Sequence, residues 1–222
     1  MTDAPRDIPQ GKRRHVMNTE QVIGIITLMG KRMEQEKEFL TDLDNAIADG
    51  DHGINMARGF AAVEAKIAPL GDKDIGTVLK TAGMTLVSAV GGSAGPLYGT
   101  AFMRSGVVMN GKTEMNIADL TACLKASVEG VMQRGKAVKG EKTMLDSMIP
   151  ALEAIENGIN GGLDGKDAVL CGVKAAREGV EYTKTIAATK GRASYIGERS
   201  IGHQDPGATS FTYLLEVIAD AL

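Results

Sequence analysis

The stretch NTEQVIGIITLMGKRMEQEKEFL, which runs from Asn18 to Leu40, decides the fold class of this 222-residue chain. Its apolar side chains recur mostly three or four positions apart, at Val22, Ile25, Ile26, Met29, Met33 and Leu40. That spacing places them along one face of an α-helix, and Asn18 or Thr19 can cap the first turn. The stretch therefore predicts an amphipathic helix that packs its apolar face into a core.

The same periodicity returns in seven segments farther along the chain. They are 53–66, 74–90, 97–109, 117–134, 144–157, 167–188 and 207–221. Gly, Pro, Asn or Asp residues separate them, and no run of β-branched or aromatic residues between turns predicts a strand. Aromatic residues make up only 4% of the chain, whereas its 28 glycines suit close contacts between helices. We therefore expect an all-α fold, an antiparallel eight-helix up-and-down bundle or closed barrel with its loops gathered at two ends.

Size and composition favour one domain. The chain is 43% hydrophobic and long enough to bury one sizeable core. Residues 1–16 combine two prolines and a basic cluster with no apolar segment, so we expect a flexible extension there, no secretory signal, and a single helical domain over 17–222. No apolar run approaches the roughly 18 residues of a membrane span, so we expect a soluble protein.

The charge of the chain argues against a nucleic-acid partner, and its cysteine content argues for a reducing compartment. The 25 Lys and Arg residues and 28 Asp and Glu residues give a net charge of -3, so the chain lacks the broad positive field that nucleic-acid binding requires. Cys123 and Cys171 both lie in segments with helical periodicity, and we interpret them as buried thiols in a reducing compartment, the cytoplasm.

The most specific stretch is DNAIADGDHG, which places the carboxylates of Asp44, Asp49 and Asp51 within eight residues. Three like charges so close together repel one another unless a cation neutralises them. On one continuous helix Asp49 would point about 140° away from Asp44. Gly50 and Gly53 permit the chain to turn, so that all three can converge. An all-oxygen ligand set suits Mg²⁺, which takes its remaining ligands from water and substrate phosphates.

Of two other interpretations of this stretch, the sequence excludes one and leaves the other open. An EF-hand calcium loop that began at Asp49 would need an acidic fifth residue, a glycine sixth and a glutamate twelfth, whereas the chain has Gly53, Ile54 and Phe60 there. That calcium site is excluded. A solvated turn with capping aspartates remains the alternative, and His52 taken alone is an ordinary surface or core residue.

A second stretch, VGGSAGPLYG from Val90 to Gly99, separates two of the predicted helices. A glycine-rich turn that leads into a helix N-terminus presents free backbone N–H groups and the positive end of the helix dipole, and both favour phosphate. A tight interhelical turn is the alternative. Neither G-x-x-x-x-G-K-[ST] nor G-x-G-x-x-G occurs, so a nucleotide site here is of another kind.

A third stretch runs from Lys190 to Ser210 and contains KGRASY and GHQDPGATS. Arg192 offers a rigid guanidinium for phosphate oxygens, and the Pro-Gly pair opens the last predicted helix. Alone, such a segment could be a solvated loop. Together, an acidic cluster, two glycine-opened helix starts and one arginine favour a nucleotide-dependent phosphotransferase, because phosphoryl transfer depends mainly on positioning and charge neutralisation.

From about Met17 to Leu222 the chain resembles the L subunits of bacterial dihydroxyacetone kinases. The shared elements, in order, are D-x4-D-x-D-H-G at Asp44 to Gly53, V-G-G-x-x-G-P-L-x-G at Val90 to Gly99, R-G-K…K-T-M-x-D at Arg134 to Asp146, and K-G-R-A-S-Y…S-I-G-H-Q-D-P-G-A-T-S at Lys190 to Ser210. The resemblance implies an eight-helix barrel that holds ADP or ATP at one end, with two Mg²⁺ ions between the aspartates and the phosphates.

The resemblance also implies a set of site residues. The metal ligands would be Asp44, Asp49 and Asp51, and Arg192, Asp49 and Asp51 would serve the transfer itself. The nucleotide contacts would come from His52, Asn55, Ser93, Ala94, Gly135, Met144, Arg192, Asp205, Pro206 and Gly207. One position departs from the family, since many relatives have serine where this chain has Ala94. The hydroxyl here stands one residue earlier, on Ser93.

In this family the γ-phosphoryl group passes to dihydroxyacetone, which a partner K subunit holds covalently through its own histidine. The donor is either exchangeable ATP or bound ADP that a phosphohistidine carrier of the sugar phosphotransferase system rephosphorylates, and the sequence leaves both open. Two alternatives also stay open. One is a nucleotide-sensing module that reports to a transcriptional regulator, and the other is a kinase subunit for a four-carbon ketose such as erythrulose.

Overall fold

The computed structural model describes residues 16–222, so almost all of the predicted extension 1–16 lies outside the described residues. The elements are β1 (Met17–Asn18), α1 (Thr19–Gln35), α2 (Lys37–Ile47), α3 (His52–Ile67), η1 (Ala68–Leu70), α4 (Ile75–Ala89), α5 (Ala94–Val108), β2 (Glu114–Met115), α6 (Ile117–Gly135), α7 (Leu145–Asn160), α8 (Gly165–Thr183), η2 (Arg192–Ser200) and α9 (Pro206–Ala221). The all-α prediction is confirmed.

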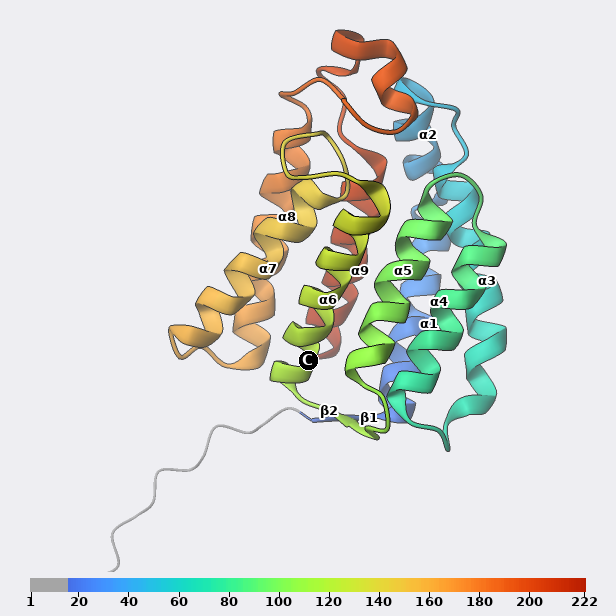
Figure 1. The fold of residues 1–222 in the computed structure, drawn as a ribbon, viewed down its shortest axis with the longest axis vertical. Helices are drawn as coiled ribbons and strands as arrows, with labels where there is room; N and C mark the ends of the chain where they lie inside the picture. Colours follow the sequence, from blue (N-terminus) through green and yellow to red (C-terminus); the bar gives the residue numbers. More distant parts are fainter. Residues whose placement is uncertain (1–15) are drawn as a thin grey trace, which may run out of the picture.

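Eight of these helices form a closed ring. Each of α3 to α8 packs against the helix that follows it, α1 packs against α3, and α9 packs against α1 and closes the ring. Successive helices run in opposite directions along the long axis, and the loops gather at the two ends (Figure 1). This arrangement is the predicted up-and-down barrel, and it lets each helix bury one apolar face toward a common interior.

The first predicted helix differs from the observed one. The chain leaves regular α-helical geometry at Glu36, where α1 ends and α2 begins, and α2 continues to Ile47. Arg32 bonds to Glu36 at 3.1 Å and to Glu216 of α9 at 3.2 Å, so the break lies where α1 meets the last helix. As a result α2 extends beyond the ring at the upper end in Figure 1, where it places Asp44.

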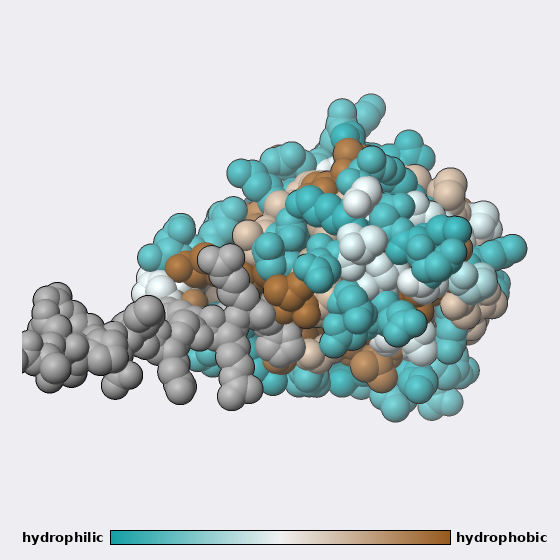
Figure 2. All heavy atoms as spheres, turned by 90° about the horizontal axis from the view of Figure 1, so that it is seen from below, coloured by the Kyte–Doolittle hydropathy of each residue, from teal (hydrophilic) through white to brown (hydrophobic). Residues whose placement is uncertain are grey.

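Two short strands at the opposite end were not expected from the sequence. Met17 and Asn18 pair with Met115 and Glu114 in a two-residue antiparallel ladder, which joins the start of α1 to the start of α6. Asn18 and Asn116 each close a capping box on the helix that follows, so the short strands are fixed by the caps beside them. In Figure 2, which views this end, hydrophilic residues cover most of the surface and hydrophobic ones form small separate patches.

The glycines permit close helix contacts, as the sequence indicated. A Cβ added to Gly83 of α4 would lie 2.7 Å from the carbonyl oxygen of Gly99 on α5, and one added to Gly172 of α8 would lie 2.5 Å from Ile155 of α7. Side chains at these positions would push the helix pairs apart. The ring therefore depends on backbone-to-backbone proximity that only glycine allows here.

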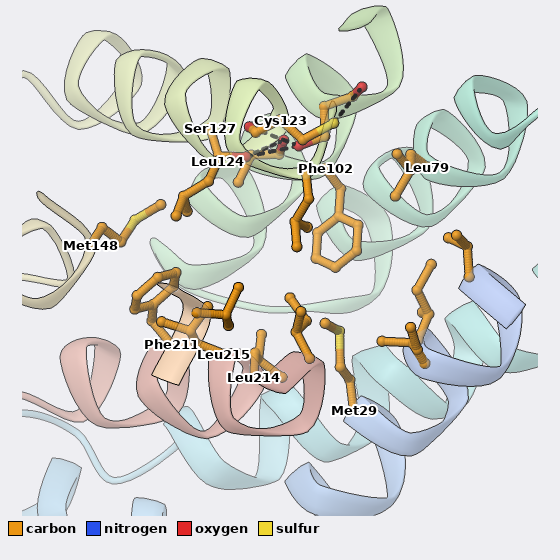
Figure 3. A pocket seen from close by; sticks show the side chains of 18 of the residues that line it. Met29, Leu79, Phe102, Cys123, Leu124, Ser127, Met148, Phe211, Leu214 and Leu215 are labelled. Carbon is orange, nitrogen blue, oxygen red and sulfur yellow. Dashed lines mark hydrogen bonds between the residues drawn. The ribbon is translucent and has the colours of Figure 1, made fainter. Parts of the chain in front are cut away.

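The barrel interior contains an apolar cavity of about 150 Å³. Figure 3 shows side chains that point into it from several helices, among them Met29, Leu79, Phe102, Met148 and Phe211. A small polar group lies on its wall, where the hydroxyls of Ser105 and Ser127 are 2.9 Å apart.

The two cysteines differ. Cys123 is a buried thiol, as expected, but Cys171 is exposed, so that part of the interpretation is wrong. The inward face of α8 is taken by Val169, Gly172 and Val173, which leaves position 171 to point outward. Within residues 16–222, no helix combines the length and the apolar character that crossing a membrane requires.

Candidate functional site

A second, more polar cavity of about 520 Å³ opens at the end of the barrel that carries α2 and η2. Five segments line it: 44–52, 91–98, 131–145, 190–193 and 205–207. They come from loops that lie together at the upper end in Figure 1 although they are far apart in the sequence. Every site residue implied by the resemblance contributes to this lining except Asn55.

The three aspartates converge. Asp44, Asp49 and Asp51 each offer a carboxylate oxygen, and these oxygens lie within 4.8 Å of one another. The turn between them is made at Gly50, whose φ of 71° suits glycine, and whose added Cβ would lie 1.8 Å from the Asn45 side chain. The chain thus leaves the helix where the sequence required it to leave.

Asp44 is the buried member of the cluster, and its burial makes a negative charge there unfavourable. Its Oδ2 accepts hydrogen bonds from the backbone N–H of Asp51 at 2.9 Å and of His52 at 3.3 Å, and no described contact uses its Oδ1. Desolvation is the main cause that raises the pKa of Asp44, and the charges of Asp49 and Asp51 raise it further, whereas the two backbone bonds oppose the shift. A cation bound between the three carboxylates would neutralise their repulsion and favour the charged form of Asp44.

His52 is not a free base. Its ring Nε2 lies 2.9 Å from the hydroxyl of Ser210, which lies 2.7 Å from the hydroxyl of Tyr98. Burial lowers the pKa of His52 to about 4, so the ring is neutral at pH 7. The network joins the starts of α3 and α9 to α5 beneath the cavity, and sequence reasoning gave no role to Tyr98 or Ser210.

The glycine turn lies beside the aspartates. Gly92 has a φ of 63°, and the chain then enters α5 with Ser93 at the N-cap, so that Ala94 and Gly95 begin the helix. The side chain of Ser93 makes no cap bond, which leaves it available at the cavity wall. The N-terminus of α5 therefore points its free N–H groups toward the cavity.

Asn55 lies behind that turn rather than in the cavity. Its side chain is buried and accepts a 2.6 Å hydrogen bond from Arg58, and a Cβ on Gly91 would lie 3.1 Å from its amide nitrogen. The helical geometry of α3 explains this, because Asn55 is three residues beyond His52 and follows the helix away from the opening.

Arg192 lies across the opening from the glycine turn, at the start of η2. Its guanidinium forms an ion pair with Asp49 at 3.0 Å, and its side chain is 60% exposed. Gly191 precedes it with a φ of 64°, and Lys190 contacts Glu141 at 3.6 Å. Arg192 is thus held over the acidic cluster, with guanidinium N–H groups left for an anion.

Asp205, Pro206 and Gly207 close another side of the cavity, where α9 begins. The Oδ2 of Asp205 accepts from the backbone N–H of Ala208 at 2.7 Å and so caps the helix. Desolvation raises the pKa of Asp205 to about 7, and the charge of Asp146 raises it further, whereas the Ala208 bond and the charge of Lys142 oppose the shift. Burial is therefore the main cost of a charge on Asp205.

A further wall, beside α5, is made by Gly135 at the end of α6 and by the loop that follows, and a Cβ added to Gly135 would lie 3.3 Å from Leu97 of α5. Met144 lies at the end of this loop and is 5% exposed. The loop is closed by Asp146, whose carboxylate accepts from the backbone N–H groups of Gly140 at 2.5 Å and Thr143 at 2.8 Å. Lys142 also lines the cavity. Sequence reasoning gave it no role, and its place in the K-T-M-x-D element was the one signal that could have identified it as a site residue.

Comparison with known proteins places the chain in a family. The model of the DAK2 domain matches residues 46–220. The ADP-binding subunit DhaL of the PEP-dependent dihydroxyacetone kinase of Escherichia coli K12 is 41% identical over 203 residues, which are 91% of this chain and 97% of that subunit. The corresponding subunit of dihydroxyacetone kinase 1 of Listeria innocua is 46% identical over 189 residues, 85% of this chain and 89% of that subunit.

A solved structure agrees with the fold. The dihydroxyacetone kinase of C. freundii in complex with AMP-PNP and Mg²⁺ superimposes with a TM-score of 0.69 at 19% identity, over 100% of this chain and 37% of that chain. At that identity the likeness shows the fold alone. The family model and the two relatives show more: the chain belongs to the DAK2 domain family, together with the DhaL subunits to which it is similar.

Proposed function

We propose that this chain is the nucleotide-binding subunit of a dihydroxyacetone-type kinase and that residues 17–222 form its single functional domain. In this proposal the cavity at the α2 end holds ADP or ATP with Mg²⁺, and the phosphoryl group passes to a short ketose on a partner K subunit. One observation carries the proposal: three carboxylates converge within 4.8 Å beside an exposed arginine and a helix N-terminus. These are the recurring groups of phosphoryl transfer.

The donor set fits Mg²⁺. Asp44, Asp49 and Asp51 supply only oxygen, and Arg192 is the one cationic side chain within the described residues that pairs with the cluster. A single guanidinium leaves the three carboxylates with a net negative charge. Hard divalent cations prefer such ligands and complete their shell with water and phosphate oxygens, so the cluster can hold two ions together with a diphosphate.

The remaining lining residues fit a nucleotide. Ser93 and Ala94 would hold phosphate oxygens at the start of α5, and the missing hydroxyl at Ala94 matters little if its backbone N–H makes the contact. His52, which is neutral, would act as a hydrogen-bonding group beside the phosphates rather than as a proton acceptor. Gly135 and Met144 would flank the base, and Asp205, Pro206 and Gly207 would close the site beside them.

The chemistry assigned to this chain is electrostatic. The metal ions would neutralise charge on the transferring group. Arg192 extends over the acidic cluster from the exposed side, so it can bind the phosphoryl group where a partner approaches. Asp49 and Asp51 would position the cations beside that group. No proton need be removed by this chain, because the acceptor hydroxyl and its base belong to the partner in this proposal.

The partner and the donor follow from the relatives. The E. coli and Listeria subunits belong to PEP-dependent kinases. By analogy we propose a K subunit as ketose carrier and a phosphotransferase-system carrier that rephosphorylates bound ADP, with exchangeable ATP as the alternative. We also propose a cytoplasmic location, where the exposed Cys171 remains a thiol.

The test has two parts. Asp49→Asn should abolish Mg²⁺-dependent ADP binding in calorimetry and leave the helical circular dichroism unchanged, whereas Asp72→Asn, an exposed aspartate paired with Lys73, should behave as wild type. The second part mixes the protein with a K-type subunit and dihydroxyacetone, using either ATP or a phosphorylated carrier as donor. Wild-type ADP affinity in Asp49→Asn would defeat the metal assignment, and no triose phosphate with either donor would defeat the kinase assignment.

A further inference from the structure

Lys142 combines two properties that are rarely found together. It is 1% exposed, and its backbone has a φ of 59°, in the left-handed region. A glycine would adopt that conformation at lower cost, and an exposed position would avoid desolvating an ammonium group. A lysine at such a position requires that the side chain make interactions that outweigh both costs.

The interactions are made by its ammonium group. Nζ donates hydrogen bonds to the carbonyl oxygens of Thr183 and His203. Thr183 is the last residue of α8, and a cation there satisfies a carbonyl that has no partner within the helix and compensates the negative end of the helix dipole. The sequence predicted that this helix continues to residue 188, and the contacts at its end explain why it stops at Thr183.

The same helix end anchors the segment that leads into α9. The backbone N–H of Gly202 donates to the carbonyl of Lys184 at 2.8 Å, and the backbone N–H of Asp205 donates to the hydroxyl of Thr183 at 2.9 Å. Lys142 adds a third link between the end of α8 and this segment, because one of its acceptors is the carbonyl of Thr183 and the other is the carbonyl of His203. The segment that supplies one cavity wall is therefore tied to the side chain of a residue in another wall.

Lys142 also fixes its own loop. The carboxylate of Asp146 accepts from the backbone at residues 140 and 143, on either side of Lys142, so the lysine backbone is held while its side chain reaches across. Thr143 and Met144 follow at once and line the cavity. None of the described hydrogen bonds of Lys142 reaches the acidic cluster at 44–51, which belongs to α2 and the turn after it.

We propose that Lys142 is a positioning residue of the nucleotide site, which holds the Thr143–Met144 wall and the Asp205–Gly207 wall at the separation that the nucleoside requires. This inference rests on the proposed function and deepens it. Lys142 does not touch the phosphates or the metal ions in this assignment. Its removal should therefore weaken binding of the nucleoside part of the ligand and spare the metal and phosphate part.

The experiment compares wild type, Lys142→Met and Lys139→Met by calorimetry, with ADP and with inorganic pyrophosphate, each in excess Mg²⁺. Lys139 lies on the same loop with its side chain 49% exposed and serves as the matched control. We expect Lys142→Met to weaken ADP binding about tenfold or more, since hydrogen bonds to a charged group are lost, and to leave pyrophosphate binding unchanged. Lys139→Met should match wild type with both ligands.

Two results would overturn the inference: unchanged ADP affinity in a folded Lys142→Met variant, or a parallel loss of ADP and pyrophosphate affinity. If Lys142→Met does not fold, Thr183→Val tests the same junction, because it removes the acceptor for the Asp205 N–H and keeps the lysine. It should also lose ADP affinity selectively, and wild-type affinity there would refute the junction. Failure of wild type itself to bind ADP would instead refute the proposed function.

Discussion

Replacing Asp44 by asparagine should stabilise the protein in the absence of Mg²⁺ and nucleotide and at the same time abolish their binding. Asp44 is 7% exposed, and its carboxylate lies within 4.8 Å of two others. The amide oxygen of asparagine can replace Oδ2 as acceptor for the backbone N–H groups of Asp51 and His52. The substitution therefore removes a buried charge and keeps its hydrogen bonds.

The magnitude follows from Coulomb's law and from exposure. Two unit charges at that separation repel by about 3.5 kcal/mol at an effective dielectric constant of 20. Asp49 is partly exposed and paired with Arg192, and Asp51 is half-buried, so screening reduces the repulsion that is relieved. We expect a gain of about 1 kcal/mol in the free energy of unfolding, which corresponds to about 2–4 °C in Tm for a chain of this size.

Thermal unfolding followed by circular dichroism, with and without Mg²⁺ and ADP, measures both effects. Wild type at an ADP concentration about 100 times its Kd gains about 2.7 kcal/mol, whereas Asp44→Asn gains almost nothing. The order of the two Tm values should therefore reverse when the ligands are added. A lower Tm for the variant without ligands would show that the cluster is not repulsive, and an equal ligand-induced shift would show that Asp44 does not hold the metal.

The pH dependence provides an independent check. The folded-state pKa of Asp44 is raised above its ordinary value of 3.8, so its charge costs stability only where the folded protein is ionised. Wild type therefore loses this part of its stability as pH rises through the folded pKa, and the variant does not. Below the ordinary value both states of wild type are protonated at Asp44, so the advantage of Asp44→Asn should disappear there.

Three further expectations concern other parts of the molecule. Arg192→Ala should weaken ADP binding about tenfold or more, less so at high salt, in calorimetric titrations. Gly95→Ala should lower the free energy of unfolding by about 1–3 kcal/mol in urea titrations, because its Cβ would lie 2.2 Å from a backbone carbonyl oxygen, whereas Gly24→Ala, with no atom within 4 Å, should raise it by up to about 1 kcal/mol. Cys171 should react with a thiol reagent in the folded protein and Cys123 should not, because Cys123 is buried and desolvation raises its pKa to about 12.

Hydrophobic periodicity was sufficient for the fold class, because each long helix buries one face against the same interior. It was insufficient where a tertiary contact sets the local geometry. The break at Glu36 lies beside the Arg32 to Glu216 ion pair, which joins α1 to α9, and no local pattern reports that pair. The same is true of the end of α8 at Thr183, where the apolar spacing continues but Lys142 binds the terminal carbonyl.

In the candidate site, too, features set by local sequence could be predicted and contacts between distant segments could not. The aspartates at 44, 49 and 51 could be grouped from sequence, because the glycine at 50 that brings them together lies among them. The pairing of Asp49 with Arg192 is a contact between distant segments, and the motifs predicted that both residues serve one site but not that they form an ion pair. Asn55 follows the acidic element directly, and its side chain accepts a bond from Arg58 and lies outside the lining of the cavity, so its contact with a nucleotide stays a prediction.

The unfavourable features of this chain are concentrated at one end of the barrel. That end holds the clustered carboxylates, the buried lysine with left-handed backbone and several glycines at positive φ, whereas the helices below it are closely packed and apolar inside. Because a closed ring fixes each helix by two neighbours, it can tolerate charge repulsion in the loops at one end without losing its shape. It follows that substitutions which relieve the repulsion, such as Asp44→Asn, should raise stability and remove function together, whereas substitutions in the ring should lower stability first and affect binding only as the protein unfolds.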